Sequence, residues 1–281
     1  MHHTGYQPES VVLIGAGNAI DSALQKGLQK VGFRVQLLGR EQLIGDTVST
    51  RSDAIVINAA SCGSAAPGEA RAVCEAVREL PCTALLHLSS YAVFGRARRK
   101  KIDEEEEPAP ASERGHEWLA CEETFSSVEN ASILRLGWLV DRSENALLGR
   151  VLRSLLDGQP VNLEDVSRGN PVTVSDLVRV TVAIAQQLAS GGPRSGVYHY
   201  GSADTCSSME FGHEVVDRVR SLYGEDFAAE LVALETEGED RSSVLSCERL
   251  RDVFGIQQRS WRQGLTRQVE LWLERLQKPV S

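Results

Sequence analysis

A glycine-rich turn near the start of the chain is the first stretch whose residues could do chemistry. Residues 15–20 read GAGNAI, follow the apolar run Val11–Ile14 and lead into a stretch with helical spacing of its apolar residues. In such a turn, backbone N–H groups approach a diphosphate, and the N-terminus of the following helix favours its negative charge. Glycines fill the first two positions of G-x-G-x-x-G, but isoleucine fills the third. The turn therefore predicts an incomplete phosphate site made by Gly15, Gly17, Asn18, Ala19 and Ile20.

Two charged residues near the turn change what it could bind. Asp21 places a carboxylate where the helix must pack closely on the strand, so it would repel a diphosphate. Arg40 stands where the second strand-like run ends. An acid there would bind the 2′-hydroxyl of NAD, whereas an arginine suits the 2′-phosphate of NADP. The sequence thus favours NADP over NAD, and the alternative that no cofactor is bound stays open.

The turn must be positioned by the elements around it, and apolar patterning predicts them. Strand-like runs at 33–38, 53–60, 82–90 and 132–136 alternate with helical patterns at about 67–80, 112–127 and 144–156. This alternation predicts an α/β fold with a doubly wound parallel sheet. The texture changes from about residue 160, and the chain ends in an amphipathic helix at 261–276. We expect a Rossmann-like domain over 1–160 and a smaller C-terminal lobe over 161–281 that partly packs back on the sheet.

Charge and hydropathy exclude several classes of function. The formal net charge of the 281 residues is -9, which argues against a general binder of nucleic acid or anionic membranes. No apolar run approaches the roughly 20 residues that span a bilayer. The first ten residues lack the basic and apolar regions of a signal peptide, so we expect a cytoplasmic protein. The charged run GRARRKKIDEEEEPAP at 95–110 is typical of a solvated surface loop.

Cysteine and histidine spacing gives no support to a metal site. The six histidines form no HxxxH or HExxH pair, and the cysteines form no CxxC pair. Scattered single cysteines are usually small core residues. We expect that role for Cys62, Cys74, Cys82, Cys121, Cys206 and Cys247.

Six segments stand in a fixed order along the chain: VVLIGAGNAIDSAL, DAIVINAAS, HLSSYAVFG, ILRLGWLV, GNPVTVSDLVRV and SSVLSCERLRDVFGI. In this order they resemble the extended short-chain dehydrogenases, most closely the dTDP-4-dehydrorhamnose reductases and related sugar-nucleotide reductases and epimerases. The stretch between the second and fourth strands is short for that family, so one strand and one helix are expected to be missing. The resemblance implies a nicotinamide cofactor and a nucleotide-sugar ligand. It adds Asn58, Ala59 and Ala60 to the cofactor candidates, and Arg168 and Asn170 as candidates in the substrate lobe.

The resemblance also implies a set of catalytic positions, and this chain departs from it. The family uses a serine or threonine to hold the substrate carbonyl, a tyrosine to deliver the proton, and a lysine four residues later. Ser90 matches the hydroxyl position. The family pattern P-x-x-x-Y-G-x-x-K falls without gaps on Pro110, Arg114, Gly115 and Trp118. Arginine thus replaces the tyrosine, and tryptophan replaces the lysine.

These two replacements remove the proton chemistry. A guanidinium stays protonated and has no acceptor, and an indole offers one neutral donor. Tyr91 adjoins Ser90 but points to the opposite side of an extended segment, and His116 lies roughly 200° around the helix from Arg114. The first hypothesis is therefore a non-catalytic, nucleotide-binding or regulatory protein, acting through a protein partner or as a homodimer. The alternatives are an NADP-dependent sugar-nucleotide reductase or epimerase with rearranged acid–base residues, and a structural subunit without cofactor.

Overall fold

The computed structural model describes residues 9–45, 52–61, 69–95, 101–141, 146–193, 195–224, 230–234 and 242–277. Cys62 and residues 96–100 of the charged run at 95–110 lie outside these ranges. Among the described residues, no helix is both long and apolar enough to cross a membrane.

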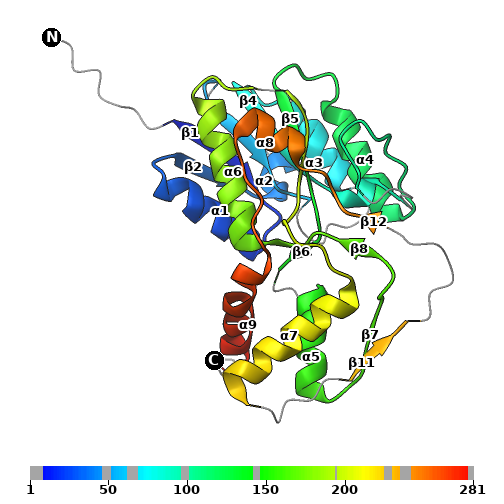
Figure 1. The fold of residues 1–281 in the computed structure, drawn as a ribbon. Coiled ribbons are helices and arrows are strands. Elements are labelled where there is room, and N and C mark those ends of the chain that lie inside the picture. Colours follow the sequence, from blue (N-terminus) through cyan, green and yellow to red (C-terminus); the bar gives the residue numbers. More distant parts are fainter. Residues whose placement is uncertain are drawn as a thin grey trace.

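A six-stranded parallel sheet forms the larger part of the molecule (Figure 1). Its strands lie in the order β2-β1-β3-β4-β5-β10. Their bounds are β1 (Ser10–Ile14), β2 (Arg34–Leu38), β3 (Ile55–Asn58), β4 (Ala84–Ser90), β5 (Ala131–Leu136) and β10 (Gly196–Tyr200). The parallel sheet with helices on both faces confirms the doubly wound α/β fold that the alternating pattern predicted.

Alternating side chains of the strands build one apolar core on each face of the sheet. On one face, Val11 and Leu13 pack with α1 (Ala19–Lys30), α6 (Val174–Ala189) and α8 (Glu248–Phe254). On the other face, Val12 and Ile14 pack with α2 (Arg40–Gly45), α3 (Glu69–Arg78) and α4 (Glu113–Phe125). Successive residues of a strand point to opposite faces, so the run Val11–Ile14 serves both cores.

The edge of the sheet at β2 agrees with the short connection noted in the sequence. No strand stands between β2 and β3 in the described part of the chain, and only the single helix α2 follows β2 there. The periodic pattern did not predict α2, because its six residues are too few to show a helical repeat. β2 is consequently the outermost strand, and its residues Arg34, Gln36 and Leu37 are exposed.

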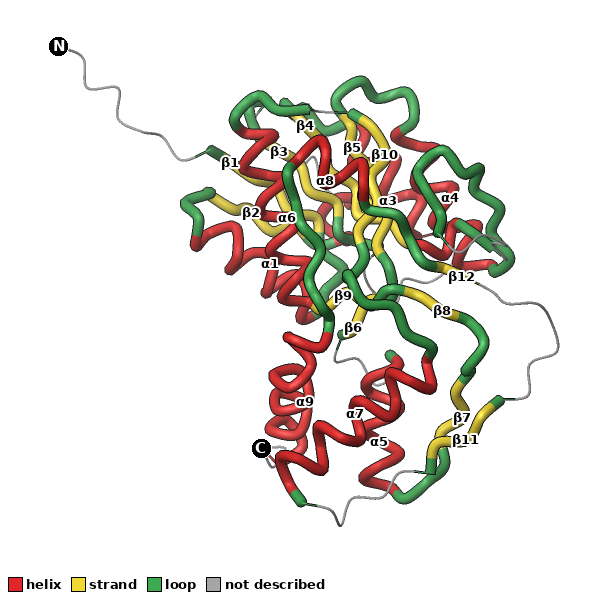
Figure 2. The backbone as a smooth tube through the Cα atoms, in the orientation of Figure 1, coloured by secondary structure: helices red, strands yellow, loops and turns green. Residues whose placement is uncertain are grey.

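The C-terminal lobe lies to one side of the sheet (Figure 2). It has an apolar core of its own. Helices α5 (Leu147–Asp157), α7 (Ser208–Tyr223) and α9 (Arg262–Gln277) surround this core. Three short parallel strand pairs lie outside the main sheet: β6 (Leu139–Val140) with β9 (Val172–Thr173), β7 (Val161–Leu163) with β11 (Leu231–Ala233), and β8 (Arg168–Gly169) with β12 (Ser242–Ser243). The β7–β11 pair packs on the core of the lobe. Elements that follow residue 160, namely α6, β10 and α8, pack on the sheet and not in the lobe.

The acidic half of the charged run differs from a simple solvated loop. Ile102 is 1% exposed and forms a bridge with Leu245. Glu104 accepts a hydrogen bond from the His199 backbone N–H at 3.0 Å, and Glu105 pairs with Arg249. The run therefore covers the outer edge of the sheet beside β10. One apolar residue in a charged sequence was too weak a signal to predict this packing.

Candidate functional site

The glycine turn is closed by two side chains of its own helix. Asn18 is the N-cap of α1, and its side chain accepts hydrogen bonds from the backbone N–H groups of Ile20 and Asp21. Asp21 returns the interaction: its Oδ2 accepts from Gly17 N–H at 2.6 Å and from Asn18 N–H at 3.1 Å. This reciprocal capping box gives four N–H groups at the start of the helix an internal acceptor.

The two glycines serve this closed arrangement. A Cβ on Gly15 would lie 2.5 Å from Asp21 Oδ2, so a side chain at that position would displace the carboxylate. Gly17 has a φ of 80°, in the left-handed region that glycine adopts without strain. The turn does not fit a dinucleotide diphosphate as it stands, because these N–H groups are engaged and a buried carboxylate lies beside them.

The other cofactor candidates are gathered at the same edge of the sheet. Arg40 begins α2, and its Nη2 donates to the Ala60 carbonyl oxygen at 2.6 Å, which joins the end of β2 to the end of β3. Asn58 is fully buried; its Oδ1 accepts from Ala60 N–H at 3.2 Å and its Nδ2 donates to Cys74 Sγ at 3.5 Å. Ala59 N–H donates to the Ile14 carbonyl oxygen at 2.9 Å. Asn58 thus holds the loop after β3 from within the protein.

Ser90 and Arg114 lie on either side of a short 3₁₀ helix, η1 (Tyr91–Val93). Ser90 ends β4, and its Oγ accepts a hydrogen bond from Ala92 N–H at 3.2 Å, so this hydroxyl caps η1. Arg114 is exposed in the first turn of α4. Gly115 allows α4 to approach η1, because a Cβ there would lie 2.4 Å from the Ala92 carbonyl oxygen. The catalytic candidates are therefore brought together around η1.

Tyr91 begins η1 and interacts electrostatically with Arg114. The expectation that Tyr91 points away from Ser90 assumed an extended segment, but the chain turns into η1 at this residue. Burial raises the pKa of the Tyr91 phenol, and the positive charge of Arg114 lowers it. A tyrosine and a cation thus stand side by side here, although on different elements from the family's pair.

Trp118 fills a small apolar core. It is 7% exposed and packs in a cluster with Val93, Phe94, Ile102 and Leu245. These partners come from η1 and the residue after it, from the covered charged run and from the segment between β12 and α8. An ammonium group at this position would need to leave the cluster to reach water or a ligand.

Comparison with known proteins identifies the family. The model of the RmlD substrate binding domain matches residues 9–273, which is nearly the whole chain. This chain belongs to that family. Within it, the dTDP-4-dehydrorhamnose reductase of Burkholderia thailandensis is 25% identical over an alignment that covers 90% of this chain and 95% of the reductase. The corresponding reductase of Sinorhizobium fredii is 25% identical over 192 residues, which cover 66% of this chain and 65% of that protein.

Solved structures extend the likeness to the extended short-chain dehydrogenase fold. dTDP-4-dehydrorhamnose reductase from Bacillus anthracis, in complex with NADP, has a TM-score of 0.73 at 20% identity and covers 93% of this chain and 98% of its own. UDP-glucuronic acid 4-epimerase from Bacillus cereus, in complex with NAD, has a TM-score of 0.75 at 15% identity and covers 96% and 100%. At these identities the likeness shows the fold that the RmlD family shares with the epimerases.

Behind Ser90, this RmlD-family chain holds a buried ion pair. Arg135 on β5 donates from Nε to Glu122 Oε1 at 3.0 Å and from Nη2 to Glu122 Oε2 at 2.7 Å. Ser89 donates its hydroxyl to the same carboxylate, and the Phe94 ring lies 4.9 Å from the guanidinium carbon. His199 completes the cluster; burial and the charge of Arg135 lower the pKa of its imidazole to about 3. All charges in this cluster are paired, so it fixes α4 against the sheet and presents no free acid or base.

The two substrate-lobe candidates have internal partners. Arg168 is half-exposed and forms a bidentate pair with Glu210, with N–O distances of 2.9 and 2.8 Å. Asn170 is 1% exposed; its Nδ2 donates to the Leu245 carbonyl oxygen at 3.1 Å and its Oδ1 accepts from Leu245 N–H at 3.2 Å. Asn170 therefore fastens the segment before α8 to the end of the sheet. Asn170 also packs against Gly137, which follows Leu136, the partner of Ser90 in the sheet.

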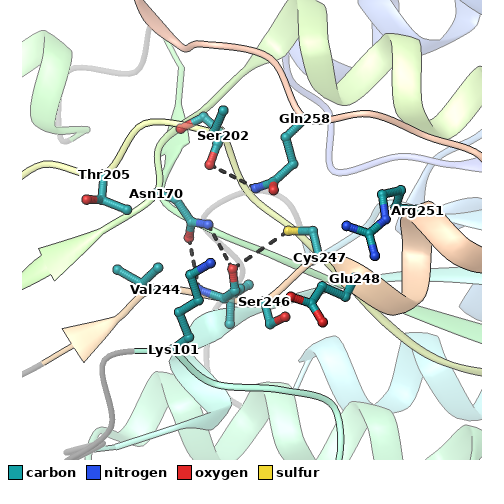
Figure 3. Close-up of a pocket in the computed structure, with 12 residues that line it drawn as sticks. Lys101, Asn170, Ser202, Thr205, Val244, Ser246, Cys247, Glu248, Arg251 and Gln258 are labelled. Carbon is teal, nitrogen blue, oxygen red and sulfur yellow. Dashed lines mark hydrogen bonds between the residues drawn. The ribbon is translucent and has the colours of Figure 1, made fainter.

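Asn170, Lys101 and Arg251 are among the residues that line a small polar pocket (Figure 3). Its volume is about 140 Å³. Drug-sized ligands typically occupy about 300–1,000 Å³, so this pocket by itself is too small for a nucleotide sugar. Cys247 lines the pocket, and burial raises the pKa of its thiol to about 12, which keeps the thiol protonated.

In the described part of the chain, no cluster of three potential metal ligands is found. The core role predicted for the cysteines is confirmed for Cys74, Cys121, Cys206 and Cys247, which are free and buried. Asp21 is the residue whose role the sequence reasoning understated. Its position three residues after Asn18 is the N-x-x-D spacing of a capping box, and that signal was present in the sequence.

Proposed function

We propose that this chain is a member of the RmlD family that has lost ketone reduction and acts by binding. The observation that carries the proposal is the pair of side chains at the Tyr and Lys positions. Arg114 is exposed and permanently charged, and Trp118 is buried in an apolar cluster. Neither side chain can donate a proton to the substrate and then take one up again, as a tyrosine phenol does. General acid catalysis alone contributes about 10²–10⁴-fold to a rate, so its loss silences the reaction.

The family supports nucleotides as the ligand class of the proposed binding protein. Relatives solved with NADP and with NAD support a nicotinamide dinucleotide, and Arg40 at the end of β2 supports NADP over NAD. The closed glycine turn opposes the diphosphate of such a ligand, so the dinucleotide binding that we propose is weak. A nucleotide sugar is the second ligand that the relatives support. A protein without turnover acts through the molecules that it binds. We therefore propose that this chain binds a protein partner or a second copy of itself, and that it does so in the cytoplasm.

The test is an assay for reduction by the unmodified protein. Incubated with NADPH and a dTDP-4-dehydro sugar, the chain should oxidise NADPH no faster than buffer does, while a family reductase with its tyrosine and lysine in place turns over. NADPH absorbance measures the rate. Turnover that disappears in Ser90→Ala would overturn the proposal.

A second candidate function rests on Tyr91. Burial raises the pKa of its phenol, and the positive charge of Arg114 opposes that rise, which is the kind of electrostatic help that a lysine gives the tyrosine of an active reductase. An NADP-dependent sugar-nucleotide reductase or epimerase with rearranged acid–base residues would use this pair. The same assay distinguishes it: turnover lost in Tyr91→Phe and retained in His116→Ala would favour this candidate.

A further inference from the structure

Asp21 occupies the glycine turn in a way that helix capping alone does not explain. Its side chain is 3% exposed, yet its Oδ1 is buried with no hydrogen-bond partner among the described residues. Burying a carboxylate costs free energy unless both oxygens are satisfied. The chain therefore keeps a poorly compensated negative charge at the place where related folds approach a diphosphate.

A second capping box in the same chain shows the difference. At the start of α7, Ser207 and Glu210 form the same reciprocal pattern. There the carboxylate is 44% exposed and pairs with Arg168. An acid that only caps a helix thus lies at the surface beside a cation, whereas Asp21 lies under the turn against Gly15.

We propose that Asp21 is an internal anion that takes the place of a ligand phosphate in the turn and so discriminates against dinucleotides. A diphosphate could gain the N–H groups of Gly17 and Asn18 only by breaking their bonds to Oδ2. It would then lie beside the carboxylate charge, which is repulsive at low effective dielectric. The inference rests on the proposed function, because it specifies which ligand class that binding site disfavours and by which residue.

The experiment is a titration of the purified full chain with NADPH, in which calorimetry measures the affinity. Asp21→Ala should bind NADPH at least about tenfold more tightly than the unmodified protein, since two charge-assisted hydrogen bonds no longer compete. Asp21→Asn keeps the size and one acceptor oxygen but removes the charge, so its affinity should lie between the two. Asp217→Ala is the control for charge, because Asp217 lies on the exposed surface of α7.

Loss of the cap will lower stability, so circular dichroism without ligand must first show that each variant is folded. Equal NADPH affinity of the unmodified protein and Asp21→Asn would overturn the inference, even where Asp21→Ala does not fold. A gain that Asp217→Ala reproduces would also overturn it. The proposed function fails on a different readout, namely NADPH oxidation by the unmodified protein, so the two failures are distinguishable.

Discussion

His87 shows at the scale of one residue how burial links this fold to pH. It lies in β4, is fully buried, and packs on Phe125 with 4.9 Å between ring centroids. Burial lowers the pKa of its imidazole to about 3, against an ordinary value near 6.5. The folded protein therefore keeps His87 neutral over a range in which the unfolded chain takes up a proton. The stability that neutral His87 contributes is fully present above about pH 6.5 and is lost progressively as the pH falls toward 3.

We predict that His87→Leu weakens the acid sensitivity of the protein. When the pH falls from 7.5 to 5.5, a histidine that stays neutral in the folded protein lowers the free energy of unfolding by about 1.4 kcal/mol. The variant should lose that much less than the unmodified protein, as measured by urea denaturation at the two pH values. His116→Gln, at an exposed position of α4, is the control and should keep the full difference. An unchanged difference in His87→Leu would contradict the prediction.

At the scale of single residues, some features of the site could be predicted from the sequence and others could not. The placement of Arg114 and Trp118 at the Tyr and Lys positions comes from aligning one motif and stays a prediction. The proximity of Tyr91 to Arg114 was not predictable, because it depends on the chain leaving the extended conformation at one residue. The carboxylate of Asp21 was predicted beside the turn, but its bonds to Gly17 and Asn18 needed the backbone geometry of the N-cap.

At the scale of elements, the contact between α4 and η1 depends on a glycine. A Cβ at Gly115 would lie 2.4 Å from the Ala92 carbonyl oxygen and 2.9 Å from Pro110 Cβ. The first of these atoms belongs to the backbone, so it cannot move aside as a flexible side chain does. Gly115 is thus the position at which the catalytic candidates on the two elements are held together.

We predict that Gly115→Ala destabilises the protein by about 1–3 kcal/mol, as overpacking does, although alanine favours a helix by about 1 kcal/mol. Chemical denaturation measures the change. Gly39→Ala is the matched control, because its added Cβ would meet its nearest neighbour, Gln42 Oε1, at an ordinary 3.7 Å. Stability equal to or above that of the unmodified protein would show that α4 shifts at no cost.

Helices and strands long enough to show an apolar repeat were predictable from the sequence, and shorter elements were not. The strands predicted at 33–38, 53–60, 82–90 and 132–136 and the helices predicted at about 67–80, 112–127, 144–156 and 261–276 appear within a few residues of these bounds. α8 was not predicted as a helix, because seven residues between Cys247 and Gly255 give barely two turns of pattern. Packing of the segment around Ile102 on β10 depends on partners far away in sequence, which local pattern does not contain.

At the scale of the whole molecule, the chain passes repeatedly between its two main bodies. The core of the lobe takes residues from Val140–Leu163, then from α7, and finally from α9. Between these segments the chain returns to the sheet at Val172, in α6 and β10, and again in α8. The predicted division into 1–160 and 161–281 stays a prediction, and the lobe is built from segments whose ends are anchored in the sheet.

This threading predicts that the sheet and the lobe unfold together. A lobe made of one continuous segment could open alone, but opening this one pulls on β5, β10 and α8 at once. Tryptophan fluorescence reports mainly on the lobe, through Trp138, Trp261 and Trp272, while far-UV circular dichroism reports on the whole chain. The two signals should trace one coincident transition in urea.

Leu265→Ala sharpens this test, because Leu265 is fully buried in the core of the lobe on α9. The cavity should cost about 2–5 kcal/mol and move both signals to lower urea by the same amount. Leu86→Ala, equally buried in the sheet core, is the matched variant and should shift both signals in the same way. If Leu265→Ala instead moved fluorescence alone, the lobe would be an independent folding unit, and its ligands could be bound or released without disturbing the glycine turn.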